Sequence, residues 1–105
     1  MANFVLVYTG GSRPATEAEG KKAMEAWGAW FGQLGDKVVD AGNPFDAHAK
    51  TLSNGSVSDG AAGTPATGYS ILKADSLSSA TKLAQGCPHL QSGGKITVYE
   101  VTPLM

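Results

Sequence analysis

Two stretches of the sequence, one near each end, predict β-strands whose two faces are both apolar. Residues 4–8, FVLVY, are apolar at every position, and in residues 96–101, ITVYEV, apolar side chains again fall on both alternating sets. Successive side chains of a strand point to opposite faces of its sheet. A sheet that contains these strands must therefore be covered on both faces.

The order of the predicted elements selects one arrangement of such a sheet. The elements are a strand at 4–8, a helix at 17–34, a strand beginning at 38, two strands at 47–52 and 56–58, a strand at 68–74, a helix at 77–87 and a strand at 95–101. This β-α-β-hairpin-β-α-β order predicts the α+β class and a ferredoxin-like split βαβ fold. Two helices then cover one face of an antiparallel sheet, and the other face stays open.

Local signals set the ends of the two helices. Thr16 and Glu19 form the S/T-x-x-E pattern, in which a hydroxyl and a carboxylate satisfy unpaired backbone donors at a helix start, and Gly35 marks the helix end. The second helix has a cap at residues 75–76 and stops at the glycine and proline of residues 86–88.

The middle of the chain predicts a hairpin followed by a loose connection. Asn54-Gly55 lies between the strands at 47–52 and 56–58, and both residues tolerate the positive φ of a type I′ turn. Residues 59–67, DGAAGTPAT, are small and rich in glycine and proline, which predicts a mobile connection to the next strand.

Size and composition favour one small domain with no polyanionic partner. The 105 residues suffice for one hydrophobic core, so we expect a single domain over 1–105. The net charge of −1 provides no field that attracts nucleic acid or an anionic membrane. The apolar stretch near the N-terminus is too short for a signal sequence or a membrane span. One cysteine forms no internal disulfide, which fits a cytoplasmic protein.

The strands with two apolar faces also predict a partner chain. A bare apolar patch the size of a sheet face is uncommon on a monomer. We therefore expect a second copy of the chain to cover the open face, giving a symmetric homodimer with two sheets face to face.

Several motifs together resemble the YCII-related (DGPF-type) family of small bacterial proteins. The matching stretches are Trp27 to Trp30, Val39 to Pro44, Gly68 to Leu72, Ala74 to Leu77, Gly86 to Pro88 and Val98 to Val101. Ser58-Asp59-Gly60 stands at the start of the family's Asp-Gly-Pro-Phe signature, with Ala61-Ala62 in its last two places. The resemblance implies a dimeric α/β barrel with a cleft between sheet and helices, in a family whose members mostly have no assigned activity.

The resemblance also bears on catalysis. One branch of the family is proposed to pair a histidine on the first helix with an aspartate near the next strand. The helix at 17–34 contains no histidine. Asp36 and Asp40 can supply a carboxylate, and His48, which follows the turn at Asn43-Pro44, is the candidate base. His48 and Asp40 are the catalytic candidates.

Aromatic residues mark the candidate ligand site. Trp27 and Trp30 share one helical stripe, which either packs in the core or, with Met24 and Phe31, forms the wall of a pocket. The polar groups that can orient a ligand there are Tyr8, Asn43, His48 and Tyr69.

The remaining motifs predict no metal or cofactor. Cys87-Pro88-His89 is interpreted as a helix terminus, with Cys87 a small buried residue and His89 next to the last carbonyls. One cysteine and two distant histidines do not make a zinc site. The paired glycines lack the spacing of a phosphate loop and are interpreted as turns.

Two functions stay open. The first is a small-molecule-binding or accessory module. The second is a cofactor-independent enzyme of the isomerase, lyase or oxygenase type that acts on a small apolar or aromatic metabolite, an analogy that rests on the fold alone.

Overall fold

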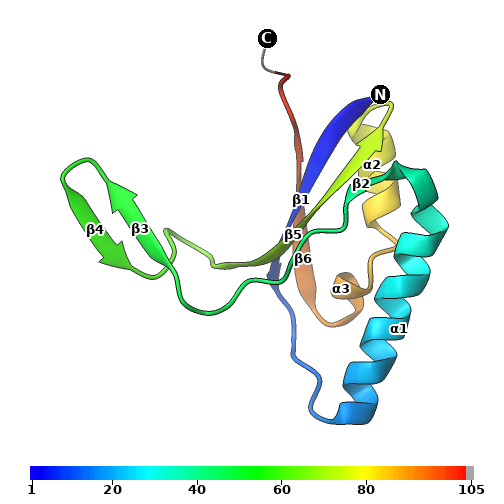
Figure 1. The fold of residues 1–105 in the computed structure, drawn as a ribbon, viewed down its shortest axis with the longest axis horizontal. Coiled ribbons are helices and arrows are strands. Elements are labelled where there is room, and N and C mark those ends of the chain that lie inside the picture. Colours follow the sequence, from blue (N-terminus) through cyan, green and yellow to red (C-terminus); the bar gives the residue numbers. More distant parts are fainter. Residues whose placement is uncertain (104–105) are drawn as a thin grey trace.

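The strands of the chain form one four-stranded sheet and a separate hairpin, and the computed structural model describes them within residues 1–103 (Figure 1). The elements are β1 (Ala2–Gly10), α1 (Glu17–Leu34), the 3₁₀ helix η1 (Gly35–Lys37), β2 (Val38–Asp40), β3 (Lys50–Ser53), β4 (Ser56–Asp59), β5 (Ala66–Ala74), α2 (Leu77–Ala84), α3 (Pro88–Gln91) and β6 (Gly94–Glu100). The sheet has the order β2-β5-β1-β6 with antiparallel neighbours throughout. Because β5 lies between β1 and β2, the strands joined by α1 are not neighbours, as a split βαβ arrangement requires. The predicted α+β class is confirmed.

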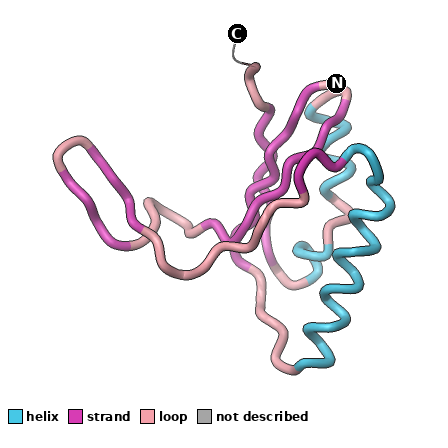
Figure 2. Tube along the Cα trace, viewed as in Figure 1, coloured by secondary structure: helices cyan, strands magenta, loops and turns pink. Residues whose placement is uncertain are grey.

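The face of the sheet away from the helices carries an apolar band that crosses three strands. Val5 on β1 pairs with Ile71 on β5 and with Tyr99 on β6, and Val7 pairs with Tyr69. Their neighbours along β1 are buried beneath the helices, whereas the two valines are only half-buried. Figure 2 shows the helices together on the other side of the sheet. We call the face that bears these five residues the open face.

Helix α1 begins where the sequence predicts. The Thr16 hydroxyl accepts a hydrogen bond from the Glu19 N–H at 3.1 Å, and the Glu19 carboxylate accepts one from the Ala15 N–H at 2.8 Å. Trp30 and Leu34 on its apolar stripe are buried against the sheet. No helix within residues 1–103 has both the length and the apolarity to cross a membrane.

The second predicted helix is shorter than its pattern suggests. Ser76 caps α2 by accepting a hydrogen bond from the Ser79 N–H at 3.1 Å, but the helix ends at Ala84. Cys87 therefore does not belong to α2 and instead precedes the short helix α3. Pro88 suits the first turn of α3, where a backbone N–H has no helical partner. The helix thus ends before the stop predicted at residues 86–88, and a helical turn that the sequence did not predict follows it.

The chain between β2 and the hairpin runs along the outer edge of β5. The Tyr69 N–H donates to the Asn43 carbonyl at 3.3 Å, and the Phe45 N–H donates to the Thr67 carbonyl at 2.8 Å. These bonds hold residues 41–45 beside the start of β5, where they form one wall of a cavity.

The predicted hairpin exists, but its first strand and its turn differ from expectation. Strand β3 begins at Lys50 rather than at 47, because the Asp46 carboxylate accepts the His48 N–H at 3.0 Å and holds a turn there. Only Gly55 of the turn has positive φ, which is the type II pattern and not type I′. The hairpin reaches away from the sheet on the side opposite the helices (Figure 1).

Candidate functional site

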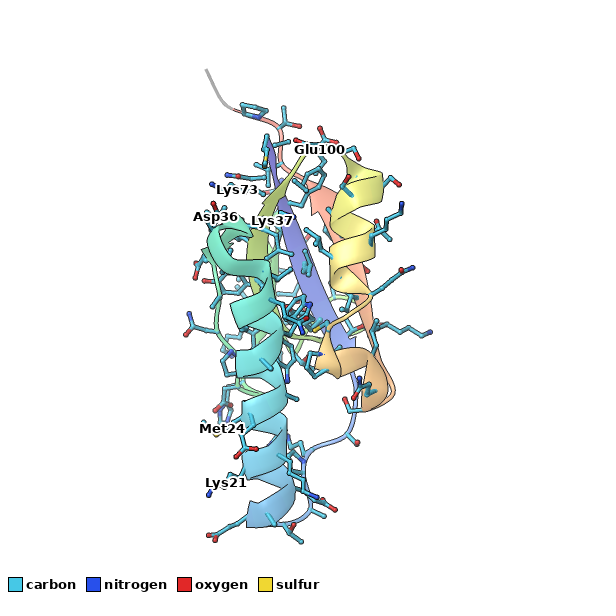
Figure 3. The ribbon with its side chains drawn as sticks, turned by 90° about the vertical axis from the view of Figure 1, so that its right-hand side faces the viewer. Lys21, Met24, Asp36, Lys37, Lys73 and Glu100 are labelled. Atoms are coloured by element: carbon cyan, nitrogen blue, oxygen red, sulfur yellow. The ribbon has the colours of Figure 1, made fainter. Side chains whose placement is uncertain are left out.

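A cavity of about 490 Å³ opens between α1 and the edge of the sheet beyond β2. Its walls come from α1, from residues 41–44, from the ends of β1 and β5 nearest the hairpin, and from α3. The lining residues are Tyr8, Met24, Trp27, Phe31, Ala41, Gly42, Asn43, Pro44, Thr67, Gly68, Tyr69, Ser70 and His89. Figure 3 shows Met24 on the flank of α1 that faces away from α2. We call this space the aromatic cavity.

Four rings form a continuous wall of the aromatic cavity. The ring of Tyr8 lies 5.3 Å from that of Trp27, nearly perpendicular to it, and 5.3 Å from that of His89. Trp27 in turn lies 5.8 Å from Phe31. Such edge-on and tilted contacts add about 0.5–1.5 kcal/mol each beyond the burial of area. The wall is therefore formed before any ligand arrives.

Two buried hydroxyl groups connect this wall to residues 41–45. Tyr8 donates to the Ser70 hydroxyl at 2.8 Å, and Ser70 donates to the Ala41 carbonyl at 2.7 Å. Burial raises the pKa of Tyr8 well above its ordinary value, and the hydrogen bond to Ser70 offsets only part of that rise. Tyr8 is thus a neutral phenol whose proton is engaged, while its oxygen can still accept a hydrogen bond from a ligand.

The backbone of β1 holds His89 in one orientation. Its Nε2 lies 2.8 Å from the carbonyl oxygen of Thr9. A carbonyl only accepts, so Nε2 carries a proton and donates it to Thr9. No partner for Nδ1 is found within the described part of the chain. The ring lies against Gly94, where a Cβ would overlap it. His89 therefore lines the cavity with a fixed ring, and its Nδ1 lies on the side of Gly11, which lines a neighbouring hollow.

Four of the six predicted ligand residues line this cavity, namely Tyr8, Trp27, Asn43 and Tyr69. Tyr69 differs from the other three because its side chain turns toward the open face, where its hydroxyl donates to Asp40 at 3.3 Å. Contact of these residues with a ligand stays a prediction.

Trp30, the fifth predicted residue, does not line the cavity. It is only 4% exposed, and its indole N–H donates to the Leu83 carbonyl of α2 at 3.1 Å. The ring packs 5.8 Å from that of Trp27 and so supports the wall from behind. Trp30 therefore packs in the core, whereas Trp27 forms part of the pocket wall.

His48, the sixth, lies outside the aromatic cavity. Its side chain is 98% exposed at the base of the hairpin, and its Nδ1 is 2.7 Å from the Asp46 carboxylate. Asp40 instead accepts the Gly42 N–H at 2.8 Å. Within residues 1–103 no hydrogen bond or ion pair joins His48 to Asp40. The structure does not bring the two catalytic candidates together.

His89 was interpreted from the sequence as part of a helix end, yet it lines the aromatic cavity. It also lines two further hollows beside this cavity, one formed by residues 12–14, α1 and α3, and the other by residues 10–14 and the base of the hairpin. Its position depends on contact with β1, eighty residues away in the chain. The one local signal is Gly94, whose missing side chain makes room for the ring.

Cys87 fits its interpretation as a small buried residue, being 1% exposed within the core. Burial raises the pKa of its thiol to about 11, more than the backbone hydrogen bond to His89 lowers it. No three His, Cys, Asp or Glu side chains of residues 1–103 lie together as a metal site would need.

The Cys87 thiol should therefore react slowly and with a shifted pH profile. At pH 8 we expect iodoacetamide to modify the folded protein at least a hundredfold more slowly than the urea-unfolded chain, because the thiolate is the nucleophile. The rate for the folded protein should keep rising toward pH 11, whereas that of the unfolded chain should level off above about pH 8.5. Mass spectrometry at timed intervals measures both. Equal rates at pH 8 would contradict the buried, protonated thiol.

Comparison with known proteins locates this arrangement among solved folds. No family model and no curated protein matches the chain. The chain shares the fold of a solved dehydrochlorinase. This protein is the 5-chloro-2-hydroxyhydroquinone dehydrochlorinase of Burkholderia phenoliruptrix AC1100, in complex with 2,5-dihydroxybenzoquinone. The TM-score is 0.55 at 16% identity, over 94% of this chain and 93% of that chain. Membership of the YCII-related family stays a prediction.

Proposed function

We propose that this protein binds a small, planar, mostly apolar molecule in the aromatic cavity. The observation that carries the proposal is the preformed wall of Tyr8, Trp27 and Phe31 around a space of about 490 Å³. Binding sites for small molecules measure about 300–1,000 Å³ and combine apolar and aromatic walls with a few polar groups. The aromatic cavity has these properties.

The polar atoms of the cavity indicate which ligand groups it recognises. The Tyr8 oxygen can accept a hydrogen bond, because its own proton is donated to Ser70. A flat ring that carries a hydroxyl donor, such as a phenol or a hydroquinone, satisfies this acceptor. A ring without a donor leaves it unpaired, which costs binding free energy.

The dehydrochlorinase of the same fold supports this ligand class in a general way. Its structure holds 2,5-dihydroxybenzoquinone, a flat ring with two hydroxyl groups. The fold thus accommodates a ligand of the proposed size and shape, while the choice of ligand rests on the side chains of each protein.

Calorimetric titration tests the proposal. We expect hydroquinone to bind the wild-type protein more tightly than 1,4-dimethoxybenzene, which has a similar ring and no donor. Trp27→Ala should weaken binding at least tenfold, because it removes one side of the wall. Circular dichroism confirms that the variant is folded.

His48→Ala is the matched control, since it also removes an aromatic ring but lies outside the cavity. Its affinity should stay within twofold of the wild type. Equal losses in both variants, or unchanged binding in Trp27→Ala, would place the ligand elsewhere.

A cofactor-independent enzyme is the second candidate, and one observation favours it. The His89 ring lines the cavity and the Thr9 carbonyl fixes it through Nε2, which leaves Nδ1, on the Gly11 side, as the candidate general base. Chromatography of ligand incubated with the protein separates the two functions. Turnover that His89→Gln abolishes favours the enzyme, and binding without turnover favours a small-molecule-binding or accessory module.

We also propose that the protein is a homodimer joined through the open face, giving a dimeric α/β barrel. The apolar band of Val5, Val7, Tyr69, Ile71 and Tyr99 supports this, because an exposed apolar surface of this kind marks an interaction site. In a twofold dimer the band of one copy packs against the same band of the other.

A further inference from the structure

The hairpin and its two connections, residues 46–65, form an arm that the rest of the chain does not support. None of these twenty residues is buried, and only Thr51 and Gly60 are even partly covered. Strands β3 and β4 contact chiefly each other. The arm therefore has no core of its own and shares none with the sheet and helices.

An arm of this kind is not expected to keep its shape alone in water. Fixing the backbone costs about 1–2 kcal/mol for each residue, and burial of apolar area normally offsets that cost. An isolated two-stranded hairpin is at best marginally stable. The ordered arm thus needs a surface outside its own chain to pack against.

One face of the arm is suited to such packing. Leu52 and Val57 are directly paired across the two strands, and they are 73% and 63% exposed. The next pair on this face is Lys50 and Asp59, whose charged groups lie 2.6 Å apart. The opposite face carries only hydroxyl side chains, from Thr51, Ser53, Ser56 and Ser58. An apolar pair on one side only is typical of a strand pair that docks by that side.

The arm and the open face meet at an angle. In Figure 1 the helices lie on one side of the sheet and the arm extends from the other, so that the chain has the outline of an L. The molecule measures 45 × 44 × 18 Å, which fits this flat, angled shape. A second sheet placed against the open face lies within the angle and beside the arm.

The surface area indicates how much a partner has to cover. The chain exposes 7431 Å², whereas a compact monomer of 10.7 kDa exposes about 5,500 Å². Two copies that each buried the excess of about 1,900 Å² would hide roughly 3,800 Å² in total, within the range of about 2,000–5,000 Å² for permanent homodimers. The open face together with the arm provides such an area.

We propose that the arm of each copy packs its Leu52–Val57 face on the body of the other copy. This inference rests on the proposed homodimer and adds a second contact to it, because twofold symmetry makes the exchange reciprocal. The base of the arm, at Ala47, Ala49 and Gly60, also lines the hollow next to His89. Docking of the arms therefore also fixes the surroundings of the ligand site.

Two aspartate substitutions on β3 test the arm. Leu52→Asp places a carboxylate on the apolar face, and Ser53→Asp places one on the hydroxyl face of the same strand. Analytical ultracentrifugation should show a dissociation constant of the dimer raised at least tenfold by Leu52→Asp and less than threefold by Ser53→Asp. Amide hydrogen exchange of residues 50–59 should be slow in the dimer and fast in Leu52→Asp.

A third variant separates the arm from the sheet contact. Val7→Asp on the open face should dissociate the dimer whether or not the arm docks. Suppose that Val7→Asp dissociates the dimer, while Leu52→Asp dimerises like the wild type and keeps the same rate of amide hydrogen exchange in the arm. The homodimer through the open face is then supported, and the proposal that the arm docks is wrong. If the wild-type protein is monomeric at a concentration of tens of micromolar, both the homodimer and the docking of the arm are overturned. Slow exchange of the arm at concentrations where the wild type is monomeric shows that the arm packs on its own chain, and also overturns the proposal.

Discussion

Gly42→Ala should lower the free energy of unfolding by about 3 kcal/mol or more. Gly42 has φ +81°, and a Cβ there would overlap the carbonyl of Tyr69. The neighbour is backbone of β5, so no side chain can swing away, and residues 41–45 have to leave the edge of the sheet. This movement breaks the hydrogen bond from the Tyr69 N–H to Asn43 and the bond from Ser70 to the Ala41 carbonyl. Urea denaturation followed by circular dichroism measures the change.

Gly93→Ala is the matched control for this prediction. Gly93 has φ +84°, but nothing lies within 4 Å of the position of its Cβ. It therefore tests the backbone strain alone, which is about 1–2 kcal/mol for an L-residue in this conformation. If Gly42→Ala costs no more than Gly93→Ala, then residues 41–45 are not held tightly against β5, and the wall of the aromatic cavity is less rigid than described.

The secondary structure could be predicted from the sequence because its signals are local. The hydroxyl of Thr16 and the carboxylate of Glu19 cap α1 as the four-residue pattern predicts. The alternation of residues 4–8 places apolar side chains on both faces of β1, as observed. The predicted element boundaries that proved wrong depend on interactions that the apolar pattern does not contain, such as the turn that Asp46 forms at the start of the hairpin.

The candidate site could be predicted only in part, because it is assembled from segments far apart in the chain. Trp27 and Trp30 belong to one apolar stripe, and spacing alone does not tell which ring faces the cavity and which faces α2. From the sequence, His48 is expected on a strand after the turn at Asn43-Pro44, whereas His89 is expected only beside a helix end. The structure places His48 in solvent, whereas His89 reaches the cavity through its bond to Thr9.

Gly94→Ala should displace the imidazole of His89 and weaken ligand binding about tenfold, without unfolding the protein. Gly94 does not have positive φ, so alanine causes no backbone strain there. The atoms that a Cβ would meet are those of the His89 ring, a side chain that can rotate away. Rotation breaks the hydrogen bond to the Thr9 carbonyl and removes the ring from its place beside Tyr8 in the cavity wall. The ¹⁵N chemical shifts of the ring nitrogens report this change even in the absence of ligand.

A double-mutant cycle decides whether His89 mediates the effect of Gly94→Ala. If it does, the double variant Gly94→Ala/His89→Ala should bind the ligand about as weakly as His89→Ala alone, since the group that the first substitution displaces is already missing. Additive losses would mean that Gly94→Ala damages the cavity by another route, for example by moving β6 away from Gly10, its partner on β1. Unchanged ¹⁵N shifts in Gly94→Ala would show that the ring keeps its place and that β6 has moved instead. In that case the orientation of His89 depends on Thr9 and not on the space left by Gly94.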